Sequence, residues 1–119
     1  MRKDIILEDA TLRDGEFAPG IAFDKEAKIE IYKALVEAGI KWLEVGMPGM
    51  GGTELESALI IKDMAPSDRV VALSYNKGTL EDISISISAG FKAIHFGLPT
   101  VRKHKKYTRE WIISESEKL

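Results

Sequence analysis

The order of apolar patterns along the chain most constrains its fold, because short apolar runs alternate with longer segments of helical periodicity. Four runs have the length of a strand, and they occupy residues 5–7, 41–46, 69–74 and 92–97. Parallel strands need long crossover connections, so strands that alternate with helices indicate a parallel sheet. The sequence therefore predicts an α/β fold of four consecutive βα units in a single domain, residues 1–119.

Three of the predicted helices have identifiable beginnings. Asp24 is the expected N-cap of the first helix, because its side-chain oxygen can accept from a free backbone N–H group. The fourth helix is expected to begin at Thr108. Thr53 and Glu56 have the spacing of a capping box, which predicts that the second helix begins there.

The segment between the third and fourth strands has two interpretations. Ile and Ser alternate strictly over residues 83–88, as in a half-buried strand. However, Leu80, Ile83 and Ile87 share one helical face, and Thr79 can cap a helix. We favour a helix, because strand and helix alternate in the flanking sequence.

Two architectures accommodate four βα units. One is an open, doubly wound sheet, and the other is half of a TIM (β/α)8 barrel. Both place functional residues in the loops that follow the strands, so the pattern of elements alone leaves the choice open.

Composition excludes several classes of protein. The formal net charge is -2 with both signs interspersed, so we expect no binding to nucleic acid or to a membrane surface. The chain has no cysteine, which excludes disulfides and thiolate zinc sites. No apolar run approaches the roughly 20 residues of a membrane span, and no cleavable leader pattern is seen. We expect a cytoplasmic protein.

Charged residues gather in the loop after the first predicted strand. Arg13, Asp14 and Glu16 surround a glycine there. One interpretation is a functional site, in which a carboxylate ligates a hard divalent metal and the arginine holds a substrate carboxylate or a developing oxyanion. The other is a solvated loop with an internal ion pair.

Glu44 is an acid inside the otherwise apolar second strand. If its side chain faces the interior it needs a partner, because an unpaired buried carboxylate is costly. Arg13, at the end of the neighbouring strand, is the natural one. The alternative places Glu44 in water.

The two histidines do not have a local metal-binding spacing. His95 lies inside the apolar fourth strand, which is typical of a hydrogen-bonded core histidine. His104 belongs to the basic run at residues 102–106, which predicts either a solvated face or a contact with phosphate or coenzyme A.

Two segments carry a family resemblance. Residues 9–23, with Thr11-Leu12-Arg13-Asp14-Gly15-Glu16 at their centre, resemble the opening motif of the homocitrate synthase and isopropylmalate synthase family. This family belongs to the DRE-TIM metallolyase superfamily, which also contains hydroxymethylglutaryl-CoA lyase. Residues 38–48 are similar to its second strand. The resemblance implies that the chain forms the N-terminal half of a TIM barrel.

The resemblance also implies residue roles. Asp14 looks like the metal ligand, Arg13 like the catalytic arginine that polarises the keto and enolate oxygens, and Glu44 like the catalytic glutamate that supports it. Arg13, Glu16 and His104 are the expected substrate-binding residues. The implied activity is a Claisen condensation of acetyl-CoA with a 2-oxo acid, most like homocitrate synthase in amino-acid biosynthesis or nitrogen fixation. The implied cofactor is a divalent metal (Mg, Mn or Zn).

Two departures qualify this resemblance. Phe17 stands where the family usually has glutamine, and phenylalanine cannot hydrogen-bond a substrate. The chain also has 119 residues against about 250 for a whole barrel, and it lacks the His-x-His pair of the family's metal site.

We therefore expect the chain to be inactive alone. It should need a second polypeptide with the C-terminal half-barrel, or a second copy of itself. The alternatives are a non-catalytic subunit or assembly module that completes a partner barrel, and a lyase or aldolase of the same superfamily.

Overall fold

The structure is a computed structural model that describes residues 4–66, 68–98 and 108–118. Its four strands are all parallel and lie in the order β1-β2-β3-β4. The strands are β1 (Glu8–Asp9), β2 (Trp42–Glu44), β3 (Val71–Lys77) and β4 (Ala93–Gly97). The α-helices are α1 (Lys25–Glu37), α2 (Gly52–Met64), α3 (Leu80–Ser88) and α4 (Arg109–Ser116). Two short 3-10 helices follow the first two strands, η1 (Asp14–Phe17) and η2 (Pro48–Met50).

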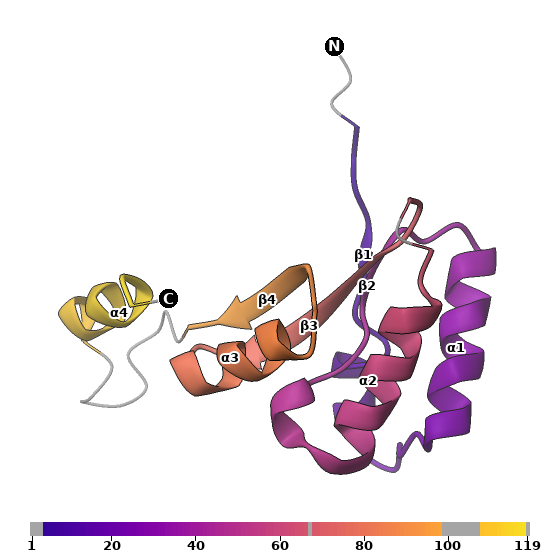
Figure 1. Cartoon of the computed structure of the whole chain (residues 1–119), viewed down its shortest axis with the longest axis horizontal. Helices are drawn as coiled ribbons and strands as arrows, with labels where there is room; N and C mark the ends of the chain where they lie inside the picture. The colour runs from indigo at the N-terminus through magenta and orange to yellow at the C-terminus, as the bar shows by residue number, and fades with distance from the viewer. Residues whose placement is uncertain (1–3, 67, 99–107, 119) are drawn as a thin grey trace.

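The strand order confirms four consecutive βα units that form half of a TIM barrel. A doubly wound sheet reverses its strand order at a switch point, whereas the strands here follow the sequence without reversal. Figure 1 shows α1 and α2 side by side, with α4 apart from them. Within the described residues, no helix has the length and apolar character needed to cross a membrane.

Two predicted caps, Asp24 and Thr79, are confirmed. The side chain of Asp24 accepts from the N–H of Ala27 at 2.7 Å. The structure adds a cap at Thr108, whose hydroxyl accepts from the N–H of Trp111, where the fourth helix was expected to begin. Thr79 accepts from the N–H of Asp82 at 3.2 Å, so the Ile/Ser segment is helical, as favoured.

The predicted capping box at the start of α2 is wrong. The helix begins at Gly52, after a Gly51 N-cap that makes no side-chain cap, and Thr53 already lies in the first turn. The reason is local. The η2 turn and the positive φ of Gly51 (+69°) direct the chain into the helix earlier than Thr53 allows.

The core lies between the sheet and the helices. Leu43 of β2 and Ile61 of α2 are fully buried, and they pack with Leu12, Val45 and Tyr32. Burial of each large side chain contributes about 1.5–3 kcal/mol. These contacts therefore hold α1 and α2 on one face of the sheet.

The first predicted strand is wrong in its position. Ile5, Ile6 and Leu7 are 87%, 64% and 67% exposed, and β1 begins only at Glu8. The run is apolar enough for a buried strand, but β1 pairs with β2 through two residues only. No described element covers residues 5–7, and Figure 1 shows this segment running out beyond the sheet.

Candidate active site

The carboxyl ends of the strands bring the predicted residues together. Arg13 lies in the turn after β1, and Glu44 is the last residue of β2. Leu43 packs on the helices, so the alternation of a strand turns Glu44 to the opposite face. The register pairs Glu44 with Leu73, and Tyr75 with His95, so these side chains share that face. We call it the inner face of the sheet.

Arg13 and Glu44 form a buried ion pair. The Arg13 Nε donates to Glu44 Oε2 at 2.6 Å, and Nη2 lies 2.5 Å from the same oxygen. The Glu44 side chain is fully buried, and that of Arg13 is 16% exposed. The predicted partnership is confirmed, and it explains how an acid is tolerated inside an apolar strand.

Tyr75 is a site residue that the sequence did not indicate. The Arg13 guanidinium carbon lies 4.2 Å from the centre of the Tyr75 ring, within the range of a cation–π interaction. A Cβ at Gly97 would lie 2.5 Å from the Tyr75 hydroxyl, so glycine leaves room for that group. The only sequence signal was its position one residue beyond the predicted third strand, and β3 in fact continues to Lys77.

His95 joins the same cluster. Its Nδ1 hydrogen-bonds Glu44 Oε1 and lies 3.4 Å from Glu8 Oε1, and its ring meets Tyr75 edge-on at 5.1 Å. The predicted hydrogen bond is confirmed, but the predicted core position is wrong, because the side chain is 44% exposed. The neighbouring Ile94 packs against the core, so His95 points to the inner face.

Asp14 lies at the edge of this cluster. Its side chain is 69% exposed, and its Oδ1 accepts from Arg13 Nη1 at 3.1 Å. The carboxylate is accessible to a hard cation, but it offers a single group. Its assignment as a metal ligand stays a prediction.

A second set of potential ligands lies on the inner face. Among the described residues, Glu8, Glu44 and His95 form the group that could hold an ion, with ligand atoms within 4.8 Å of one another. Asp14 is not part of it. Arg13 already pairs with Glu44 there, and the His95 imidazole hydrogen-bonds the same carboxylate, which accounts for the cluster without a metal.

The two other predicted residues do not join the cluster. The Glu16 carboxylate lies 2.9 Å from the ammonium of Lys28, on α1. Its substrate contact stays a prediction, as does that of His104, which lies outside the described residues.

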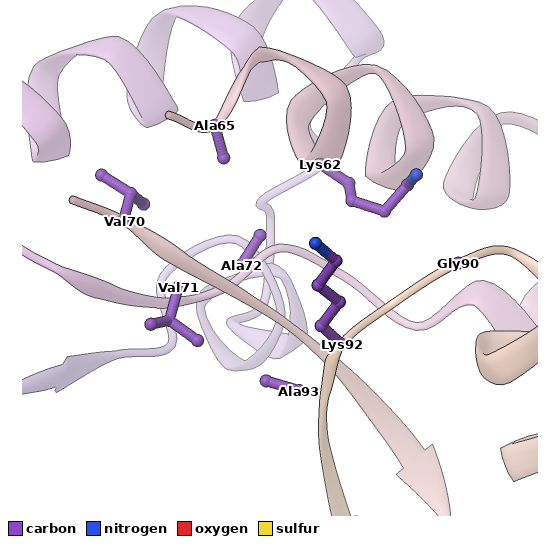
Figure 2. A pocket seen from close by; sticks show the side chains of 8 residues that line it. All are labelled: Lys62, Ala65, Val70, Val71, Ala72, Gly90, Lys92 and Ala93. Carbon is purple, nitrogen blue, oxygen red and sulfur yellow. The ribbon is translucent and has the colours of Figure 1, made fainter. Parts of the chain in front are cut away.

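A separate cavity lies at the opposite ends of the strands. It has a volume of about 240 Å³, and Figure 2 shows Lys62 and Lys92 beside it. Its floor includes Val71 and Ala93, which are the first residues of β3 and β4. Chemistry in parallel α/β folds gathers at the carboxyl ends of strands, so we do not assign this cavity to the site.

Comparison with known proteins gives a consistent set of relatives. A family model described as HMGL-like matches residues 4–119. The chain is 42% identical to 2-phosphonomethylmalate synthase of Streptomyces rubellomurinus, over 100% of this chain and 32% of that protein. It is 36% identical to 2-isopropylmalate synthase 2 of Caldanaerobacter subterraneus, over 93% of this chain and 29% of that protein. It is 32% identical to homocitrate synthase 1 of a Nostoc species, over 92% and 29% respectively. The chain thus spans about a third of the length of these relatives.

Proposed function

Since this chain belongs to the HMGL-like family, we propose that it is the N-terminal half of a metal-dependent acyltransferase that condenses acetyl-CoA with a 2-oxo acid, of the homocitrate synthase type. Its relatives are condensing synthases of the DRE-TIM superfamily, and they align with this chain over about a third of their length.

The Arg13–Glu44 pair carries this proposal. In a Claisen condensation a base removes a proton from the methyl group of acetyl-CoA, and the enolate attacks the keto carbon of the acid. Thioester hydrolysis then releases the product. Negative charge develops on the enolate oxygen and on the former keto oxygen, and a fixed guanidinium stabilises it. Glu44 and the Tyr75 ring hold Arg13 in one orientation before substrate arrives.

The described residues fit a divalent metal only in part. Asp14 supplies one hard carboxylate ligand, and no second ligand of the described chain groups with it. When bound, the metal would act as a Lewis acid on the keto oxygen. Asp14 and Arg13 are the groups that this chain contributes beside it.

The proposed site would be completed by a partner. The outer edges of β1 and β4 have no paired strand among the described residues, and the inner face is open at His95. Unpaired parallel edges favour association. We propose a second polypeptide that carries the remaining βα units, and self-association is the alternative.

The 2-oxo acid differs among the relatives by its distal group. The 42% identity to a 2-phosphonomethylmalate synthase favours a second candidate, in which that group is a phosphonate. In the homocitrate type it is a carboxylate, and in the isopropylmalate type it is an isopropyl group. The test therefore compares 2-oxoglutarate, phosphonopyruvate and 2-oxoisovalerate.

The test is release of the coenzyme A thiol from acetyl-CoA. We expect turnover only when the chain is mixed with a polypeptide that carries the remaining βα units. Arg13→Ala should lower the rate by about 100-fold or more. Arg69→Ala is the matched control, because Arg69 is an exposed arginine whose ion-pair partner among the described residues is the exposed Asp68. Turnover by the chain alone would contradict the split site, and complex formation without turnover on any acid would favour a non-catalytic module.

A further inference from the structure

We propose that Lys28 of α1 is a positioning residue of the site, although among the described residues it forms an ion pair with neither Arg13 nor Glu44. Its ammonium ties the turn that holds Arg13 to the end of the strand that holds Glu44. The inference rests on the proposed function only in naming those two residues as catalytic.

Lys28 lies in the first turn of α1 with its side chain 3% exposed. Its ammonium is 2.9 Å from Glu16 Oε2 and also contacts Glu54 Oε2. Lysine is almost never fully buried unless it is paired, because removing the charge from water is costly. The two carboxylates are therefore what holds the ammonium in this place.

The first carboxylate controls the turn after β1. Glu16 belongs to η1, two residues after Asp14. Backbone hydrogen bonds from Arg13 and Asp14 to the carbonyl of Ala10, at 3.0 and 2.7 Å, make this turn compact. Anchoring Glu16 therefore restrains the whole turn, including the backbone of Arg13.

The second carboxylate controls the end of β2. Glu54 Oε1 accepts from the N–H of Met47 at 2.8 Å. A Cβ at Gly46 would lie 2.5 Å from the same oxygen, so Glu54 lies against the backbone where only glycine fits. Gly46 follows Glu44 by two residues, and anchoring Glu54 thereby restrains the strand end.

Removal of the ammonium would separate these two anchors. Glu16 and Glu54 are only 22% and 17% exposed, and without Lys28 their like charges would repel each other. The turn and the strand end could then move apart. A displacement of about 1 Å is enough to impair a catalytic arrangement.

The experiment follows the Arg13 Nε–H by nitrogen-15 NMR in the full chain, at a temperature where thermal unfolding shows every variant to be folded. This proton is held by Glu44. We expect Lys28→Met to speed its exchange with solvent by about tenfold or more, because the pair opens more often. Lys33→Met is the matched control, since Lys33 lies on the same helix, is 54% exposed, and within the described part of the chain pairs with Glu30 alone.

Conservative variants separate positioning from stability. Lys28→Arg keeps the charge and should restore slow exchange. If Lys28→Met does not fold, Glu16→Gln and Glu54→Gln test the two arms one at a time. Unchanged exchange in a folded Lys28→Met, or in both glutamine variants, would overturn the proposal. The NMR readout needs no turnover, so it stands even if the proposed reaction fails. Where the completed barrel is active, Lys28→Met should lower kcat and Lys28→Arg should recover it.

Discussion

The sheet has a helix face, which α1 and α2 cover, and the inner face that carries Glu44 and His95. The two faces differ in how completely the chain itself buries and pairs their side chains. On the helix face, Leu43 of β2 and Ile61 of α2 are fully buried in the same core cluster. On the inner face, Arg13 and Glu44 form a buried ion pair, but the side chain of His95 beside them is 44% exposed. The stability of the chain should therefore come from the helix face, and its chemistry should depend on whatever covers the inner face.

Polar groups show the same difference. On the helix face, buried Asn76 donates to the carbonyls of Ser74 and His95 at 3.1 and 3.2 Å, and accepts from Ser86 at 2.5 Å. The side-chain N–H and C=O groups of Asn76 therefore have hydrogen-bond partners within the chain. On the inner face, the imidazole of His95 hydrogen-bonds Glu44 through Nδ1 and meets the Tyr75 ring, but the side chain is still 44% exposed. A polar network whose members all have partners stabilises one arrangement of side chains. A network with an exposed member can still accept a ligand.

The largest effect should come from a core substitution on the helix face. Leu43→Ala should lower the free energy of unfolding by about 4 kcal/mol, since it leaves a cavity in a packed core. Ile6→Ala should change it by less than about 0.5 kcal/mol, because the side chain is 64% exposed. Urea denaturation of both variants measures the contrast.

The same two variants can also contradict the assignment of residues 5–7 as exposed. A loss at Ile6 comparable with that at Leu43 would mean that residues 5–7 are buried in solution by a second molecule. Sedimentation velocity at several concentrations would then show a dimer that Ile6→Lys dissociates.

A smaller effect is expected from the ion pair at the site. A double-mutant cycle of Arg13→Ala and Glu44→Ala should give a coupling energy of about 2 kcal/mol, because Glu44 is fully buried. The exposed pair Lys33 and Glu30 is the control and should give about 0.5 kcal/mol or less. Equal coupling in the two cycles would show that the inner-face pair is solvated, and it would remove the basis for a fixed Arg13.

The helix-face network predicts the next effect. Ser86→Ala leaves the buried oxygen of Asn76 without its donor, which should cost about 1–2 kcal/mol. Ser84→Ala, on the exposed side of the same helix, should be neutral within about 0.5 kcal/mol. Chemical denaturation distinguishes them, and a neutral Ser86→Ala would indicate that water replaces the hydroxyl.

Local chemistry made part of this molecule predictable from its sequence. Asp24 and Thr79 bind backbone groups in the first turns of the helices that they cap, so their roles could be predicted from short segments of sequence. The Arg13–Glu44 pair was predictable because neighbouring parallel strands end side by side, and a buried acid needs a cation.

The remaining features depend on the surroundings rather than on local sequence. Apolar residues flank His95 on both sides, so the strand gave no alternation from which its face could be inferred. The Lys28 cluster joins three separate segments, and no spacing rule brings Glu16 and Glu54 to one ammonium. Ile5–Leu7 is apolar, but an apolar run is buried only where another element covers it.

The smallest predicted effect concerns pH and belongs to the helix face alone. Burial raises the pKa of the Tyr32 hydroxyl, because the phenolate would lose its hydration in the core. The folded chain then keeps this proton to higher pH than the unfolded chain does. Stability from this group is complete below the ordinary tyrosine pKa of about 10 and is lost as the pH rises above it.

Tyr32→Phe should therefore match the original chain at pH 7 and lose less stability between pH 10 and pH 11, by about 1 kcal/mol or less. Denaturation at the two ends of this range measures the difference. Equal slopes for the two chains would show that the Tyr32 hydroxyl reaches water, and that this part of the helix face is less tightly closed than its neighbours Leu43 and Ile61.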